Sequence, residues 1–140
     1  MYATVNDMIQ RYGQMEVRRL SVADGEVPET IIPDRIEGAL SDASLLIDSH
    51  LRVRYATPVT PAPAELVRSA CMLARFDLAH GGDREPTEQM RLAYKAVVAW
   101  LEGLAKGEAS LEGAVALAQG SGARASDRQP AFFSRPDGGL

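Results

Sequence analysis

The chain has 140 residues, of which 46% are hydrophobic and 24% charged, and its 15 basic and 19 acidic side chains give a net charge of −4. This length and composition are typical of one soluble domain, and we expect no membrane-spanning segment because no apolar run approaches the ~20 residues that cross a bilayer. The acidic balance disfavours broad binding to a phosphate backbone, and the single cysteine excludes an internal disulfide or a cysteine-rich zinc site.

The first 28 residues predict short helical stretches and a loop. Thr4 is of a type favoured at helix N-caps, and apolar residues follow at helical spacing from Val5 until Gly13 supplies a stop. A further turn or two is expected up to Leu20, followed by the loop SVADGEVP, residues 21–28. The opening MYATVNDMIQ has neither the basic nor the apolar region of a secretory signal, so a cytoplasmic location is expected.

The loop contains the triplet Asp24-Gly25-Glu26, which superficially suggests calcium binding. An EF-hand loop needs oxygen ligands at alternate positions and a terminal glutamate, and these are not present at that spacing. We therefore predict no metal site.

Two longer helices flank a proline-rich segment. Pro33 is a helix-start signal, and the apolar stripe behind it predicts a helix that runs to about Arg54. The stretch TPVTPAP, residues 57–63, contains three prolines, which forbid a helix and predict a stiff, extended connector. The helix that follows from Ala64 is apolar over more than half of its circumference, so we expect it to lie at the centre of the core.

A last helix is predicted between Pro86 and Gly107, with Trp100 on its inward stripe. Beyond it the composition changes to glycine, serine and proline among few apolar residues, which cannot bury enough surface to fold alone. The predicted fold class is therefore all-α. Residues 1–107 form a small bundle of about four helices with a proline-rich connector, and residues 108–140 form an extended C-terminal arm.

Few side chains suggest chemistry. Cys71 lies on an apolar helix stripe and is expected to be a small core residue, because a nucleophilic cysteine needs a base beside it. The two histidines, His50 and His80, lie near helix C-termini and form a metal pair only if folding brings them together. If Asp77 is buried, we expect it to pair with Arg75 or with another arginine. We predict no enzyme activity and no cofactor.

A nucleic-acid-binding regulatory or DNA-packaging module is the alternative from the binding class. Arg52, Arg54 and Arg68 would contact phosphates, and Tyr55 would stack on a base. The favoured interpretation of Tyr55 is that it closes the end of the helix bundle.

The order of several segments resembles a family of Mu-like phage and prophage proteins. They are MYATVNDMIQRYG, ALSDASLLIDSHLRVRYATPV, PAELVRSACMLARFDL and YKAVVAWLEGLAKGEASL, and together they cover Met1 to about Leu111. The ending FFSRPDGGL is also similar to the aromatic, arginine-containing ending of members. The chain departs from the family in a shorter, less acidic loop at ADGEVPE and in a longer alanine- and glycine-rich stretch after Glu112.

This family resembles head-tail connector, or head-completion adaptor, proteins. The resemblance implies a virion protein of the neck, assembled in the host cytoplasm as a homo-oligomeric ring, with a dodecameric ring as one candidate. Its partners would be the portal protein, tail or neck proteins and other copies of itself, with DNA passing through the lumen without specific binding. Partner contacts are predicted at Phe132, Phe133, Arg135, Pro58 and Pro61.

Overall fold

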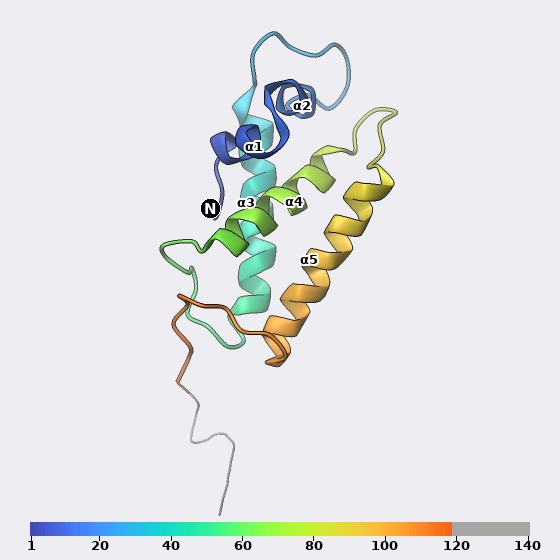
Figure 1. The fold of residues 1–140 in the computed structure, drawn as a ribbon. Helices are drawn as coiled ribbons and strands as arrows, with labels where there is room; N and C mark the ends of the chain where they lie inside the picture. The colour runs from blue at the N-terminus through green and yellow to red at the C-terminus, as the bar shows by residue number, and fades with distance from the viewer. Residues whose placement is uncertain (119–140) are drawn as a thin grey trace, which may run out of the picture.

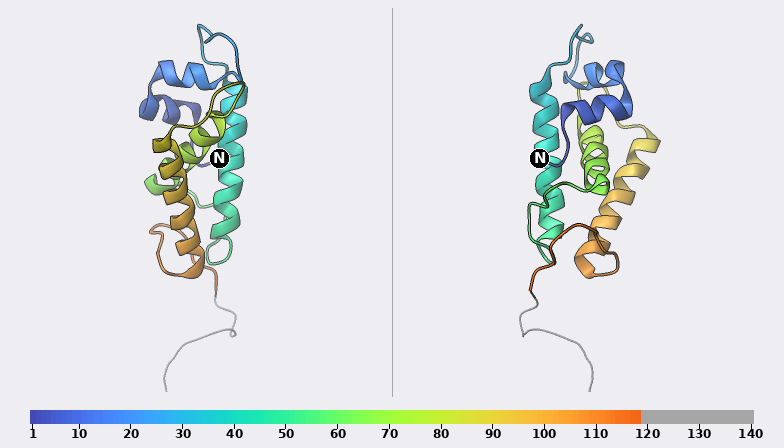
Figure 2. Two further views of the ribbon diagram at one scale, coloured as in Figure 1. Left: turned by 90° about the vertical axis from the view of Figure 1, so that its right-hand side faces the viewer. Right: turned by 60° about the vertical axis from the view of Figure 1, so that its left-hand side comes forward.

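The computed structural model describes residues 1–118, which form five helices. They are α1 (Val5–Tyr12), α2 (Gln14–Leu20), α3 (Pro33–Leu51), α4 (Ala64–Leu78) and α5 (Glu88–Lys106). Helices α3, α4 and α5 pack against one another in all three pairs, and α1 and α2 lie across one end of them (Figures 1 and 2). The all-α prediction is confirmed, and so is the stop at Gly13 (φ 87°), while the further turn or two expected up to Leu20 form a separate helix, α2, which brings the count to five.

The N-terminal segment is fixed before α1 begins. The Thr4 hydroxyl accepts from the Asp7 amide (3.1 Å) and the Asp7 carboxylate accepts from the Thr4 amide (2.8 Å), so the predicted N-cap is a complete capping box. The Tyr2 amide donates to Ser44 Oγ on α3 at 2.9 Å. Residues 1–4 therefore lie along α3 (Figure 1).

The proline-rich connector is bent, and the prediction of an extended segment is wrong. Helix α3 ends at Leu51, before the predicted Arg54, and the chain then bends at Thr57–Pro58 and Thr60–Pro61, whose peptide bonds are both cis. Between them Val59 is 3% exposed, and its amide donates to the Tyr2 hydroxyl at 3.0 Å. The segment turns inward because this apolar side chain joins the core.

Helix α4 lies at the centre of the core, as predicted. It contacts α1, α3 and α5, and it is the helix with the most buried residues in the described chain. Its buried residues are Leu66, Ser69, Ala70, Cys71, Leu73, Ala74 and Leu78. Burial on several sides explains why its apolar surface exceeds a single stripe.

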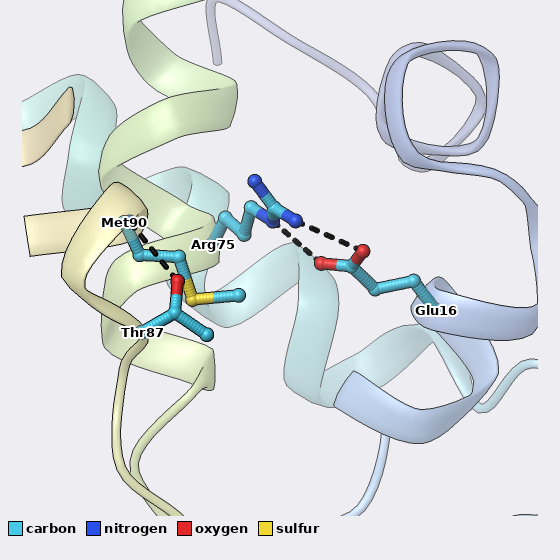
Figure 3. A network of polar contacts seen from close by, with 4 residues as sticks. All are labelled: Glu16, Arg75, Thr87 and Met90. Carbon is cyan, nitrogen blue, oxygen red and sulfur yellow. Dashed lines mark hydrogen bonds and ion pairs between the residues drawn. The ribbon is translucent and has the colours of Figure 1, made fainter.

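Both predicted ends of α5 are confirmed. The Thr87 hydroxyl accepts from the Met90 amide at 3.1 Å (Figure 3), and Gly107 adopts the left-handed conformation (φ 83°) after the last turn. Within residues 1–118, no helix combines the length and hydrophobicity needed to cross a membrane.

The chain after α5 folds back against the base of the bundle, next to the end of α3. Leu111 is 6% exposed and its amide donates to the Tyr55 hydroxyl at 3.1 Å. The Ala56 amide donates to the Val115 carbonyl (2.8 Å), and the Leu117 amide donates to the Arg54 carbonyl (2.9 Å). The division at residue 107 stays a prediction, while the predicted contacts at Phe132, Phe133 and Arg135 lie outside the described residues.

Candidate functional site

A groove runs between α4 and α5 and continues to the end of α1. Two adjoining hollows of about 310 and 370 Å³ form it, and both are lined by Arg68 and Met72. We call it the α4–α5 groove. Its other lining residues are Glu65, Ser69, Ala96, Val97 and Trp100 in the first hollow, and Arg11, Tyr12, Arg75, Gln89, Met90 and Ala93 in the second.

Trp100 gives the groove much of its apolar surface. The prediction that this residue belongs to the core is correct in part, because its side chain packs against the core but stays partly exposed. Val97 and Leu101, its neighbours on the inward side of α5, are buried. A partly exposed tryptophan beside Met72 offers a large apolar contact area.

Arg75 is held in place by Glu16 of α2. Its Nε and Nη2 donate to the two carboxylate oxygens at 2.5 and 3.0 Å (Figure 3). The Arg75 guanidinium also lies 4.3 Å from the centre of the Tyr12 ring. Asp77 is exposed. The condition for a buried pairing of Asp77 is therefore not met, and within residues 1–118 Asp77 pairs neither with Arg75 nor with another arginine, while Glu16 supplies the carboxylate at Arg75.

Two further arginines at the groove keep their charges free. Arg11 and Arg68 are exposed, and neither forms an ion pair within residues 1–118. Glu65 is the one carboxylate among the lining residues. The α4–α5 groove therefore combines an apolar floor with an excess of positive charge.

Two of the three arginines that were candidates for phosphate contacts, Arg52 and Arg54, form hydrogen bonds at the base of the bundle, while Arg68 lies in the α4–α5 groove. Arg54 Nη1 donates to the carbonyls of Leu104 (3.0 Å) and Ala109 (3.3 Å), and Arg52 Nε donates to the Asp48 carbonyl (3.2 Å). Tyr55 is 5% exposed, which confirms that it closes the end of the bundle and leaves its ring no face for a base.

The candidates for chemistry are not brought together. Cys71 is 0% exposed, and burial raises the pKa of its thiol to about 11, so it is protonated at neutral pH. His50 lies at the end of α3 with Nδ1 3.1 Å from the Leu46 carbonyl oxygen, while His80 follows α4 with its ring edge-on to Phe76. No three His, Cys, Asp or Glu side chains of residues 1–118 are placed to hold a metal ion.

Pro58 and Pro61 lie exposed on the outside of the connector. The α4–α5 groove was not predicted from the sequence, although one signal for it was present. Arg68, Met72 and Arg75 follow one another at helical spacing and so share a face of α4 that is not wholly apolar.

Comparison with known proteins decides the family. The family described as Bacteriophage Mu, Gp36 matches residues 2–127. The chain belongs to this family. The Gp36-family chain is 37% identical to Gene product J of Escherichia phage Mu over 110 residues. This aligned region covers 76% of the chain and 73% of Gene product J.

A second relative of the Gp36-family chain comes from a prophage. It is the Mu-like prophage FluMu protein gp36 of Haemophilus influenzae, 34% identical over 113 residues, or 79% of this chain and 75% of the relative. The predicted resemblance to Mu-like phage and prophage proteins is confirmed.

Proposed function

We propose that this Gp36-family protein is a structural virion protein, a head-tail connector subunit that forms a homo-oligomeric ring between portal and tail. The observation that carries the proposal is the match of residues 2–127 to a family of Mu phage proteins. A connector needs a rigid body and contact surfaces, and it needs no catalytic constellation. The buried Cys71 thiol and the separate positions of the two histidines are in keeping with that role.

The base of the bundle supports the proposal. Arg54 and Tyr55 hold the segment after α5 against the end of α3, so the chain beyond Ala118 leaves from a fixed place. The segment that contains Phe132, Phe133 and Arg135 would then begin at the same place in every copy. Adjacent aromatic side chains on such an arm are suited to docking on the portal, on a tail protein or on a neighbouring subunit.

Charge supports the passage of DNA through the ring. The net charge is −4, and the outer side of α3 presents the exposed carboxylates of Asp34, Glu37 and Asp42. A lumen lined by acidic side chains would repel phosphates, and DNA would slide without being trapped. The proposal accordingly predicts that the purified protein is not retained on DNA at low salt, whereas the alternative DNA-binding module requires retention that falls steeply with added salt.

The experiment that tests the proposal is removal of residues 119–140 followed by purification of virions. Full-length protein is expected in the particles, while the shortened chain is expected to keep its helical circular dichroism and to be absent from them. Truncation after Ala118 is preferable to truncation after Gly107 because it spares the buried Leu111. Absence of the full-length protein from virions would overturn the proposal, and normal incorporation of the shortened chain would overturn the role of the arm.

A further inference from the structure

The loop of residues 21–32 protrudes beyond the N-terminal end of α3, next to α1 and α2 (Figures 1 and 2). Arg84 donates to the carbonyls of Val22 (2.6 Å) and Ala23 (2.8 Å), and Arg18 donates to the Glu29 carbonyl (3.0 Å). A Cβ on Gly81 would lie 2.3 Å from the Ala23 carbonyl oxygen, so the turn after α4 packs closely against the loop. These bonds fix the loop through its carbonyl groups, and no loop carboxylate forms an ion pair within residues 1–118, although Asp24 lines a shallow hollow together with Arg19 and Arg84.

The outer surface of this loop is acidic with an apolar part. Asp24, Glu26 and Glu29 are exposed and form no ion pair within residues 1–118, and residues 21–32 contain no lysine or arginine. Val27 and Ile32 are 41% and 44% exposed. The loop therefore carries the charge opposite to that of the α4–α5 groove, together with apolar side chains that suit the groove's floor.

We propose that the loop of residues 21–32 of one copy docks in the α4–α5 groove of a second copy. Carboxylates of the loop face Arg11 and Arg68, and Val27 packs near Met72 and Trp100. No loop residue lines the groove of its own chain, so the contact forms between copies. Because loop and groove are different surfaces, the interface is head-to-tail, the type that generates a ring when the rotation between successive copies closes.

Charge favours the loop over the arm as the occupant of this groove. Residues 119–140 contain three arginines and two aspartates, a net charge of +1, which would face Arg11 and Arg68 with like charge. Opposite charges across an interface fix its register and disfavour wrong partners. The inference rests on the proposed ring and names the subunit contact that builds it.

Disulfide trapping tests the contact in the full chain. Val27→Cys is combined with Ala96→Cys on the exposed rim of the groove, while Cys71 stays in place because it is buried with a pKa of about 11. Mild oxidation of virions is expected to give a ladder of linked subunits on a non-reducing gel. The matched control is Val27→Cys with Leu92→Cys, which is also exposed on α5 but does not line the groove, and it is expected to give no ladder.

Charge exchange tests the recognition. Arg68→Glu or Glu26→Arg alone is expected to lower incorporation into virions roughly tenfold in competition with the wild-type chain, because each places like charges in contact. The two substitutions combined in one chain are expected to restore most of it. Glu102→Arg makes the same change on the exposed side of α5, outside the groove, and is expected to leave incorporation unaltered.

The outcomes separate this contact from the proposed function. Virions that contain the protein but show no link between positions 27 and 96 overturn the contact and leave the connector function standing. A link from Phe132→Cys to Ala96→Cys in place of the loop link assigns the groove to the arm and also overturns the contact. A ladder formed by the purified protein, with no protein in virions, supports the contact and overturns the connector function.

Discussion

The Tyr2 hydroxyl joins three segments that are distant in the sequence. It donates to the Asp48 carboxylate on α3 and accepts from the Val59 amide in the connector. Burial, followed by the hydrogen bond to Asp48, raises the pKa of this phenol to about 12. Tyr2 thus holds the N-terminal segment, α3 and the bent connector together through one polar group.

Tyr2→Phe is expected to lower the free energy of unfolding by about 1–2 kcal/mol at neutral pH, because the Asp48 carboxylate and the Val59 amide lose their partner. The folded pKa lies above the ordinary value of 10, so this stabilisation is complete below pH 10 and is lost as the pH rises through 12. Urea unfolding at neutral pH and at about pH 11 measures both effects. The difference in the free energy of unfolding between Tyr2→Phe and the wild type should be smaller at the higher pH.

Tyr94→Phe is the control for Tyr2→Phe, since the Tyr94 ring stacks on Phe76 and the change leaves that contact intact. A constant difference between Tyr2→Phe and wild type across the alkaline range would contradict the role of the phenol.

The Glu16–Arg75 pair is expected to be stronger than a surface ion pair. Its two bonds and partial burial, with side chains 20% and 24% exposed, predict a coupling of about 1 kcal/mol in a double-mutant cycle with Glu16→Gln and Arg75→Met. The pair of Glu85 and Arg91, at 3.4 Å and 79% and 44% exposed, serves as the matched comparison with a coupling near zero. Equal couplings in the two cycles would refute the distinction.

Helix ends follow from local signals in this chain. Thr4 bonds to a residue three positions ahead, as does Thr87, and Gly107 needs only its own backbone freedom. Such signals lie within one helical turn, so they were readable from the sequence. The centre of the core was readable as well, because α4 is apolar on several sides.

Features that depend on contacts between residues far apart in the chain could not be predicted from the sequence. Arg75 meets a glutamate 59 positions away, and Val59 turns inward toward a tyrosine hydroxyl 57 positions away. The partial exposure of Trp100 depends on how α5 diverges from α4 (Figure 1). In each case the residue type allowed several environments, and the packing of whole helices selected one.

Two glycines are expected to respond in opposite ways to alanine. Gly107 has φ 83°, a conformation in which a Cβ costs about 1 kcal/mol, so Gly107→Ala should lower the free energy of unfolding. Gly38 lies inside α3 and a Cβ there would meet nothing within 4 Å, so Gly38→Ala should raise it by about 0.5–1 kcal/mol. The midpoints of thermal unfolding of the two variants and the wild type measure these changes. Midpoints that shift in the same direction in both variants would contradict the opposite roles given to the two glycines.

The stability of the whole molecule depends on residues 109–117, which form part of the base of the bundle. A chain ending at Ala118 is expected to unfold at nearly the wild-type urea concentration. A chain ending at Gly107 should lose about 2 kcal/mol or more, because the Leu111 side chain leaves the core and the Tyr55 hydroxyl and Arg54 lose partners. Equal midpoints for the two truncations would show that the segment contributes nothing to the base.

The attachment of the terminal segment also defines a path for mechanical load. Tension applied beyond Ala118 first acts on the hydrogen bond from the Leu117 amide to the Arg54 carbonyl and on the bond from the Ala56 amide to the Val115 carbonyl. It next acts on the buried Leu111, and only then on the last turn of α5. The pull is therefore passed to the end of α3, in the middle of the chain, and α5 is spared from unwinding at its free end. If the protein has the proposed connector function, force applied beyond Ala118 would be carried by α3, which packs against both α4 and α5.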